Sequence, residues 1–582
     1  MDLVIRNGMV FDGSGGEGRV ADIGIKDGLI TQVGGAVAPG REEIDATGLI
    51  VTPGFVDIHT HYDGQVIWEN RLMPSSVHGV TTIVIGNCGV GFAPCRPADH
   101  DALVELMAGV EDIPEIVMVE GLPWDWESYP DYLDAIAAKP HDVDIASMIP
   151  HSALRVYVMG QRAIDREDAT QEDIAEMARL TREAIRAGSI GFATSRNLQH
   201  RSSKGEPIPT VRAAEEELQG IADVLKEEGT GVLQILTDFD QYRSIDGEFA
   251  MLRRLVERSG RPMSFSLQQK HGDPDMYRHL LDLTDEAAAE GLPIKAQVAV
   301  RPSGLLLGHR LTMTPFSKCP SYQAAAALPF EARIAELRKP EVRAAILAEA
   351  TGPCREQVRA FGDFDRMFPL ADTPDYEPPL EESIAARAKA AGVEPAAYAY
   401  DLLLENDGET ILFGAAQNYA DGSFSASEEM MSRAHSVIGL GDGGAHLGLI
   451  CDASNTTTLL AHWTRDRSRG ARIPLGRAVR SLTWDSAQAV GLKDRGRIAP
   501  GYKADLNVID YDRVVLKKPY VVYDLPAGGR RVLQDADGYV ATIVGGEVTY
   551  REGKPTGALP GKLVRGFQEP AKIGEAVAAV AA

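Results

Sequence analysis

The feature that most constrains this fold is a series of short apolar runs alternating with helical patterns along the middle of the chain. Apolar runs separated by amphipathic segments such as 171–187 and 213–227 are typical of parallel βα units. The sequence therefore predicts an α/β protein built on a (β/α)8 TIM-type barrel. The eight predicted strands span 51–58, 82–86, 145–149, 189–193, 231–236, 263–267, 294–298 and 437–441.

The two ends of the chain have a different texture, with short β-rich runs broken by glycine-containing turns. The first run, MDLVIRNGMVFDG, contains an acidic residue and alternating apolar residues, which indicate a strand and not a signal peptide, and Asn7-Gly8 indicates a hairpin turn. Similar runs return after Leu492. We expect residues 1–52 and 492–570 to form one small β-sandwich together.

The barrel is expected to occupy residues 53–491, with one large insertion. The interval 301–434 is too long for a single connection between a strand and a helix. It carries helical patterns of its own, at 340–350 and 379–391. We therefore expect an inserted cap around 301–434.

Charge and cysteine content exclude several classes of partner. The chain has 59 basic and 84 acidic residues, and its formal charge of -25 repels phosphate backbones and anionic membranes. We expect no nucleic-acid or membrane partner, and no apolar run approaches the roughly 20 residues of a membrane helix. The five cysteines fit a reducing compartment better than a disulfide framework, so we expect a cytoplasmic protein. They are Cys88, Cys95, Cys319, Cys354 and Cys451.

Two histidines one residue apart end the first predicted barrel strand. In PGFVDIHTH, His59 and His61 follow a hydrophobic run, and alternate residues of a strand point to the same face. At the C-terminal mouth of a barrel such a pair can bind one cation and leave its other positions for water. The alternative is a pair of surface histidines.

Cys88 lies in the segment GNCGVGFAP, which follows the second predicted strand. Glycines on both sides let the backbone approach a ligand and are expected to leave the thiol exposed at the barrel mouth. A thiolate there would complete a site suited to Zn²⁺. The alternative is a small buried hydrophobic residue.

Asp442 lies in GLGDGGAH, at the end of the last predicted strand. A carboxylate at this place can bind a metal weakly, accept a proton from water and pass it to a leaving amine. We therefore predict that Asp442 is the general base. A simple Asp-Gly-Gly turn is the alternative.

These motifs resemble the amidohydrolase superfamily and, within it, the N-acyl-D-amino-acid deacylases, or D-aminoacylases. The resemblance covers nearly the whole chain, since IRNG, ADIGIKDGLITQVG, PGFVDIHTHYD, GVTTIVIGNCG and GRIAPGYKADLNVID follow in the family's order. The Gly-Asn-Cys-Gly loop resembles the deacylase branch, where a cysteine bridges the metals. Hydantoinases use a carboxylated lysine on the fourth strand, and the corresponding segment here, GSIGFATS, has none.

The resemblance implies a metal site formed by His59, His61, Cys88 and Asp442. The family's histidine ligands on the fifth and sixth strands have no counterpart in LQILTD and SLQQKH, where Gln268 stands about where the second would be. An amide oxygen is a poor zinc ligand, so we expect one catalytic Zn²⁺ and an absent or altered second site.

His271 offers an alternative sixth-strand ligand. It follows Gln268 by three residues, so it would reach the site only if the loop bends. The alternative is a solvated loop histidine.

The resemblance also implies candidate substrate-binding residues. Lys270 matches a lysine that lies near the substrate in the family, and PHSALR resembles a family segment, which places His151 and Arg155 at the site. An exposed lysine and a structural histidine are the alternatives.

The family's substrate-binding arginine after the aspartate has no counterpart in HLGLICD, which weakens the case for an N-acyl-D-amino acid. His446 and Asp452 are candidates for a different recognition shell, with core or loop roles as alternatives. The loop 124–126 could offer an apolar wall, and Arg301 a fork for a carboxylate.

Three hypotheses of function follow. The first is hydrolysis of the C–N amide bond of an N-acyl compound, with a small-molecule substrate and Asp442 as proton shuttle. The second is hydrolysis of a cyclic amide, lactone or ester at the same site. The third is a catalytically inactive scaffold, and a homo-oligomer stays open in every case. Four converging ligand types argue against the scaffold.

Overall fold

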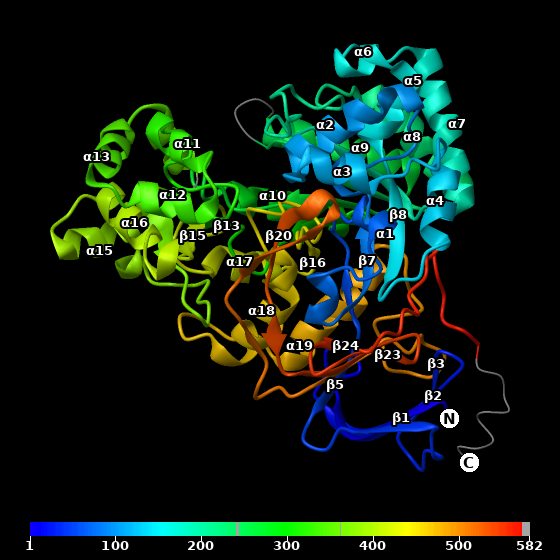
Figure 1. Ribbon diagram of the computed structural model, residues 1–582. Helices are drawn as coiled ribbons and strands as arrows, with labels where there is room; N and C mark the ends of the chain where they lie inside the picture. Colours follow the sequence, from blue (N-terminus) through cyan, green and yellow to red (C-terminus); the bar gives the residue numbers. More distant parts are fainter. Residues whose placement is uncertain (240–243, 361–362, 573–582) are drawn as a thin grey trace.

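The computed structural model describes residues 1–239, 244–360 and 363–572, and its centre is an eight-stranded parallel sheet (Figure 1). The strands follow one another in chain order, so each pairs with the next along the sequence. Each of the eight predicted strands has a counterpart in this sheet, the first of them only over its second half. They are β6 (Phe55–Asp57), β7 (Val80–Ile85), β8 (Asp144–Pro150), β9 (Gly191–Ser195), β10 (Val232–Leu236), β11 (Met263–Leu267), β12 (Ile294–Val298) and β16 (Ser436–Ile438).

The loops after the first and last strands close this sheet into a barrel. The backbone N–H of His61 donates to the carbonyl of Gly443 at 2.7 Å, and that of Asp442 donates to the carbonyl of His59 at 3.1 Å. Thr60 and Gly443 form a parallel bridge between the two loops. The expected metal-binding segments are therefore hydrogen-bonded to each other.

Helices cover the outside of the barrel, as the alternating pattern predicts. The two predicted segments are α7 (Gln171–Ala187) and α8 (Glu215–Glu228). Two further helices of the same kind follow, α9 (Ile245–Ser259) and α10 (Met276–Ala289). Helix α7 begins at a capping box of Thr170 and Asp173, and Gly188 ends it in the left-handed region at φ 118°. Their apolar faces are buried against the strands.

The first predicted strand, 51–58, is divided between two sheets. β5 (Ile50–Pro53) lies in the sheet of the chain ends, whereas β6 lies in the barrel. Gly54 separates them, and a Cβ there would lie 2.2 Å from Oγ1 of Thr81. The absence of a side chain thus permits the close passage between the sheets.

Both chain ends contribute to one nine-stranded β unit, as expected, and Figure 1 shows it beneath the barrel. β17 from the C-terminal end pairs with β22 on one side and with β5 on the other, so the C-terminal strands and the N-terminal strands join into one continuous sheet at the β17–β5 pair. The strands are β1 (Leu3–Val10), β2 (Arg19–Lys26), β3 (Leu29–Val33), β4 (Glu42–Asp45), β5, β17 (Leu506–Ile509), β22 (Tyr539–Val544), β23 (Glu547–Arg551) and β24 (Lys554–Pro555).

The predicted hairpin turn at Asn7-Gly8 is wrong. β1 continues through both residues, and its pairing with β2 shifts register between Ile5 and Gly8. Asn7 takes the left-handed conformation, φ 58°, as the extra residue of a β-bulge. A side chain at Gly8 would collide with Val51 at 2.4 Å, so this glycine serves packing between β1 and β5.

A buried ionic cluster fixes the β unit to the barrel. Asp144, at the start of β8, lies 2.7 Å from Nη1 of Arg495 and 3.1 Å from Nζ of Lys503. Lys503 also binds Asp505 at 2.5 Å. Because the carboxylates and Arg495 are buried, removing one partner would leave an uncompensated charge.

The insertion 301–434 forms a lobe with its own hydrophobic core, seen beside the barrel in Figure 1. The predicted helices appear as α13 (Pro340–Glu349) and α15 (Ile384–Ala391), the latter preceded by the short turn Leu380–Glu382. The other elements are β13 (Gly304–Leu307), α11 (Pro320–Ala326), α12 (Phe330–Leu337), α14 (Pro353–Ala360), β14 (Met367–Pro369), α16 (Pro395–Leu403), β15 (Leu412–Ala415) and α17 (Ser425–Ser432).

Cys319 and Cys354 form a disulfide within this lobe. The expectation of reduced cysteines throughout is therefore wrong for this pair. The two residues are 35 positions apart, and only the packing of α11 and α14 in one core brings their Cα atoms to 5.8 Å. Among the described residues, no helix has the length and apolar character required to cross a bilayer.

We predict that ending the chain near Leu492 yields insoluble protein. The truncation removes β17, β22, β23 and both basic members of the ionic cluster, so β5 gains an open edge and Asp144 stays buried without its partners. Solubility and size-exclusion chromatography measure the outcome. A soluble, monodisperse truncation would show that the two ends fold independently.

Candidate metal centre

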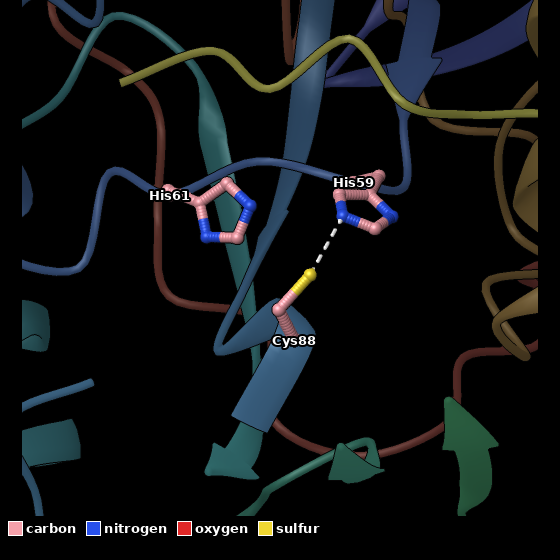
Figure 2. Close-up of side chains that lie close together, drawn as sticks. All are labelled: His59, His61 and Cys88. Atoms are coloured by element: carbon pink, nitrogen blue, oxygen red, sulfur yellow. Dashed lines mark hydrogen bonds between the residues drawn. The ribbon is translucent and has the colours of Figure 1, made fainter. Parts of the chain in front are cut away.

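His59 and His61 follow the end of β6, and both rings line the cavity at the barrel mouth. Figure 2 shows the two rings and Cys88 close to one another. Nδ1 of His59 lies 2.7 Å from Oε1 of Gln297 on β12, and the amide nitrogen of Gln297 donates to Ser264 at 2.8 Å. The amide oxygen therefore accepts the His59 Nδ1 proton, which leaves the lone pair on Nε2. This is the tautomer that a metal ligand needs.

The electrostatic surroundings shift the pKa values of the two buried imidazoles in opposite directions. Burial lowers the pKa of His59, which favours the neutral ligand form. Burial opposes the charge on His61 too, but Glu111, Asp442 and Cys88 outweigh it and raise its pKa well above the usual value. A cation binding at Nε2 of His61 would displace this proton.

Cys88 lies on a tight turn after β7, with its Sγ 3.4 Å from Nε2 of His59 (Figure 2). Its backbone is left-handed, φ 54°, and its N–H donates to Oε1 of Gln234 on β10 at 3.1 Å. Such strain persists only where the surroundings hold it. The turn is thus fixed by the fifth strand.

The prediction that Cys88 is exposed is wrong, because its exposure is only 6%. Cβ atoms at the flanking glycines would lie 2.0 Å from the carbonyl of Met148 and 2.7 Å from Cα of Thr194. Gly86 and Gly89 therefore allow the turn to pack against β8 and β9. Burial also raises the pKa of the Cys88 thiol to about 11, against the lowering effect of His61.

Asp442 completes the cluster from the loop after β16. Its Oδ1 lies 3.5 Å from Nε2 of His59 and 3.7 Å from Nε2 of His61. Burial opposes its charge, but His61, His59 and His446 outweigh it and hold the pKa below its usual range. Leu440, Asp442 and His446 all have positive φ, so three strained residues shape this loop.

These four side chains fit a divalent cation of the zinc type. Donor atoms of His59, His61 and Cys88 lie within 4.8 Å of one another, and the Asp442 carboxylate faces both imidazoles. Two imidazoles, a thiol and a carboxylate are the ligand types that Zn²⁺ takes in proteins. The structure thus brings together every predicted metal ligand.

A cavity of about 350 Å³ opens over the cluster. His446, a predicted substrate-binding residue, lines this cavity together with amide and aliphatic side chains. Its lining comprises His59, His61, Cys88, Glu111, Asn197, Gln199, His200, Leu236, Ser266, Gln268, Ser303, Leu305, Ala416, Gln417, Leu440, Asp442, His446, Leu449, Ile450 and Asp452. Gln268 donates to Ser303 at 2.6 Å within this wall.

The structure places His151 and Arg155 behind the barrel mouth, on α5 (His151–Met159), and not in the cavity wall. His151 is hydrogen-bonded to Thr194 at 2.8 Å and to Glu217 at 2.9 Å. Arg155 donates to the same Glu217 carboxylate at 2.8 Å. Both predicted substrate contacts are therefore buried in a network that joins α5 to α8.

Two further candidates also lie outside the cavity wall. The backbone of Lys270 forms an isolated antiparallel β-bridge with that of Asp273, and neither residue lines the cavity. His271 binds the carbonyl of Ala415 at 3.0 Å, so its loop does not bend toward the metal ligands. Among the described residues of the fifth and sixth strands and their loops, no histidine reaches the cavity.

The other recognition candidates are occupied by partners within the protein. Arg301 binds Asp452 at 2.9 Å and stacks over Tyr376 at 3.8 Å. The carboxylate that Arg301 binds therefore belongs to Asp452 of the same chain and not to a substrate. Trp124 stacks on His100 with ring centroids 3.9 Å apart, outside the cavity lining.

The sequence analysis missed His200, which enters the cavity from the loop after β9. Nδ1 of His200 lies 3.1 Å from Oγ of Ser195, and burial, with the neighbouring histidines, lowers its pKa to about 3. Gln234, Gln297 and Glu111 were also missed. Each is an ordinary strand or helix residue whose contact with the site arises only from folding, and no local pattern marks it.

The barrel, its closing loops and four side chains of metal-binding type at the strand ends define a barrel protein with a candidate metal centre at its mouth. The sequence model of the amidohydrolase family matches residues 42–550, so the chain belongs to this family. It is accordingly a hydrolase acting on carbon–nitrogen bonds.

Individual relatives share the sequence or the fold of this chain. The D-aminoacylase of Alcaligenes xylosoxydans xylosoxydans is 28% identical over 97% of this chain and 97% of its own length. A solved D-aminoacylase structure, concerned with its binuclear metal centre, one-metal activation and second-metal attenuation, has a TM-score of 0.64 at 23% identity, covering 97% of this chain and 99% of that one. An N-acyl-D-glutamate deacylase from Bordetella bronchiseptica, complexed with zinc and a phosphonate inhibitor, has a TM-score of 0.63 at 20% identity and covers 97% and 99%.

We predict that Cys88→Ser loses bound metal and activity together while the fold survives. A serine hydroxyl stays protonated near neutral pH and replaces the softest donor of the site. Metal content by mass spectrometry, turnover and thermal unfolding check this outcome. Cys95→Ser is the matched control, since Cys95 is also buried but lies outside the cluster. Full metal and turnover in Cys88→Ser would remove the thiol from the site.

Alkylation of the metal-free protein should be slow at neutral pH and accelerate toward pH 11. The Cys88 pKa of about 11 keeps the thiol protonated below that value, and only the thiolate reacts. Iodoacetamide labelling of Cys88, followed by peptide mass spectrometry across a pH series, measures this rise. Rapid labelling at neutral pH would contradict both the burial and the raised pKa.

Proposed function

We propose that this protein hydrolyses the amide bond of an N-acyl compound, an N-acyl-D-amino acid being the first candidate. The observation that carries the proposal is the convergence of the His59 and His61 Nε2 atoms on one oxygen of Asp442, beside the Cys88 sulfur. A family relationship to D-aminoacylase over 97% of the chain supports the choice of bond.

We propose His59, His61, Cys88 and Asp442 as ligands of one catalytic Zn²⁺. A bound divalent cation would polarise the scissile carbonyl and make water more acidic. Gln297 keeps the Nε2 lone pair of His59 directed at the cation. The described side chains ending the fifth and sixth strands supply no histidine for a second tight site. One-metal activation in the related D-aminoacylase is in keeping with a single catalytic ion.

Asp442 is proposed as the proton shuttle. The imidazoles around it hold its pKa low, so the carboxylate stays ionised and offers an oxygen that can accept a proton. A low pKa also makes it a weak base, so the proposed transfer from water to the departing amine depends on a bound cation making that water more acidic. Asp442 lines the cavity that opens over the cluster.

The cavity wall suggests how the two ends of a substrate are accommodated. Leu236, Leu305, Leu449 and Ile450 offer apolar surface for an acyl chain. Asn197, Gln199, Gln268 and Gln417 offer amide groups that hydrogen-bond to a polar amine part, together with His446.

We predict that Asp442→Asn keeps most of the bound metal but lowers kcat by about 10²–10⁴-fold. The amide fills the same space but cannot accept the proton from water. Metal analysis and steady-state kinetics check the two parts separately. Asp512→Asn, an exposed substitution, serves as the control. Comparable turnover in Asp442→Asn would remove this residue from the mechanism.

The experiment that tests the function itself combines metal analysis with a substrate screen. Protein from metal-supplemented expression is assayed for metal stoichiometry and then against N-acyl-D- and N-acyl-L-amino acids. We expect a stoichiometry near one and release of the free amine from one stereochemical series. A stoichiometry near zero would overturn the proposed metal-dependent hydrolysis.

A further inference from the structure

Glu111 is a buried carboxylate in the cavity wall to which no motif draws attention. It is the last residue of α2 (His100–Glu111) and is only 2% exposed. Its Oε1 lies 3.3 Å from Nδ1 of His61, and its Oε2 lies 3.8 Å from Nε2 of His446. Glu111 thus stands between a metal ligand and an imidazole of the cavity wall.

The environment of His59 shows what His61 requires. The Nδ1 atom of His59 has an acceptor in Gln297, so its Nε2 is free to bind a cation. Nδ1 of His61 and Oε1 of Glu111 face each other, and neither forms a hydrogen bond within the described part of the chain. Buried polar atoms left without partners are costly, so this pair is poised to complete one bond.

Metal binding decides which atom donates in that pair. A cation bound at Nε2 of His61 takes the lone pair of that nitrogen, so the remaining proton must be on Nδ1. A buried N–H then needs an acceptor, and Oε1 of Glu111 is the oxygen within reach. The carboxylate would fix both the tautomer and the rotation of the His61 ring.

The backbone around Glu111 is held in place from two sides. The N–H of His446 donates to the Glu111 carbonyl, which ties the end of α2 to the loop that carries Asp442. Asp112 accepts from Oγ1 of Thr312 at 3.0 Å, and the N–H of Thr312 donates to Gly448 at 3.0 Å. The helix end, the Asp442 loop and the inserted lobe therefore hold the carboxylate in a defined position.

We propose that Glu111 is a positioning residue that orients His61 for the metal and holds His446 against the substrate. It touches neither the substrate's reacting atoms nor the metal, and acts through these two imidazoles. This inference rests on the metal-dependent hydrolase proposed above. It adds a coupling between metal affinity and substrate recognition through one carboxylate.

The test compares Glu111→Ala and Glu111→Gln with the unchanged protein. Metal affinity is measured on metal-free protein by competition with a chromophoric chelator, and the visible spectrum of the Co²⁺-loaded protein reports the ligand geometry. We expect Glu111→Ala to weaken metal binding by about 10–100-fold and to alter the Co²⁺ spectrum. Glu111→Gln should recover most of the affinity, because an amide oxygen can accept from His61 as Gln297 accepts from His59.

Glu217→Gln is the matched control. Glu217 is an equally buried carboxylate that pairs with a histidine at 2.9 Å, but His151 is not at the metal cluster. This variant should keep the metal affinity even if its thermal stability falls. A general structural effect would lower both variants alike, whereas a positioning effect changes affinity at Glu111 only.

His446→Ala tests the second arm of the proposal. Because His446 is not a metal ligand, we expect unchanged metal affinity, a higher KM and little further loss of substrate binding when Glu111→Gln is added. Unchanged affinity and Co²⁺ spectrum in Glu111→Ala would overturn the positioning role while leaving the hydrolase intact. Failure of the unchanged protein to bind metal would instead overturn the proposed function.

Discussion

The rest of the site depends on the backbone hydrogen bonds that close the barrel. The N–H of His61 binds the carbonyl of Gly443, and the N–H of Asp442 binds the carbonyl of His59. The first and last strands end in these loops, so closing the sheet also brings the histidines to the carboxylate. A barrel that failed to close would leave Asp442 without the imidazoles that keep it ionised. Closure of the barrel therefore also assembles the candidate metal site.

Burial of several polar groups around this closure requires a supporting network. Gln297 and Gln234, from the seventh and fifth strands, hold His59 and the Cys88 turn respectively. Left-handed residues at Cys88 and Asp442 store local strain that the neighbouring strands balance. The network keeps the donors close before any cation arrives, which reduces the reorganisation that binding requires.

The peripheral parts of the chain reinforce the barrel from opposite ends. Asp144 and its basic partners tie the β unit to the start of β8, away from the cavity. At the mouth, the hairpin of β19 (Tyr520–Leu525) and β20 (Gly529–Leu533) reaches back from the same C-terminal segment, and Val532 donates to the carbonyl of Leu447 at 2.7 Å. The C-terminal segment thus contacts both ends of the barrel.

The sequence by itself determined where the barrel strands lie and which four side chains are candidates to hold a metal. Apolar runs of strand length predicted the eight barrel strands, and His59, His61, Cys88 and Asp442 could be found because each follows such a run at the same edge of the sheet. This works because strand periodicity and strand ends are local properties, readable from consecutive residues.

The tertiary structure alone decided which other side chains reach the site. His151 and Arg155 stand near a strand end in sequence, yet Glu217 from another helix draws them into a buried network. Glu111 and His200 carry no local signal, and the folding of α2 and of the loop after β9 brings them to the cavity. The exposure of Cys88 and the Cys319–Cys354 bond were likewise settled by packing between distant segments. Such contacts join residues far apart in the chain, so no consecutive pattern encodes them.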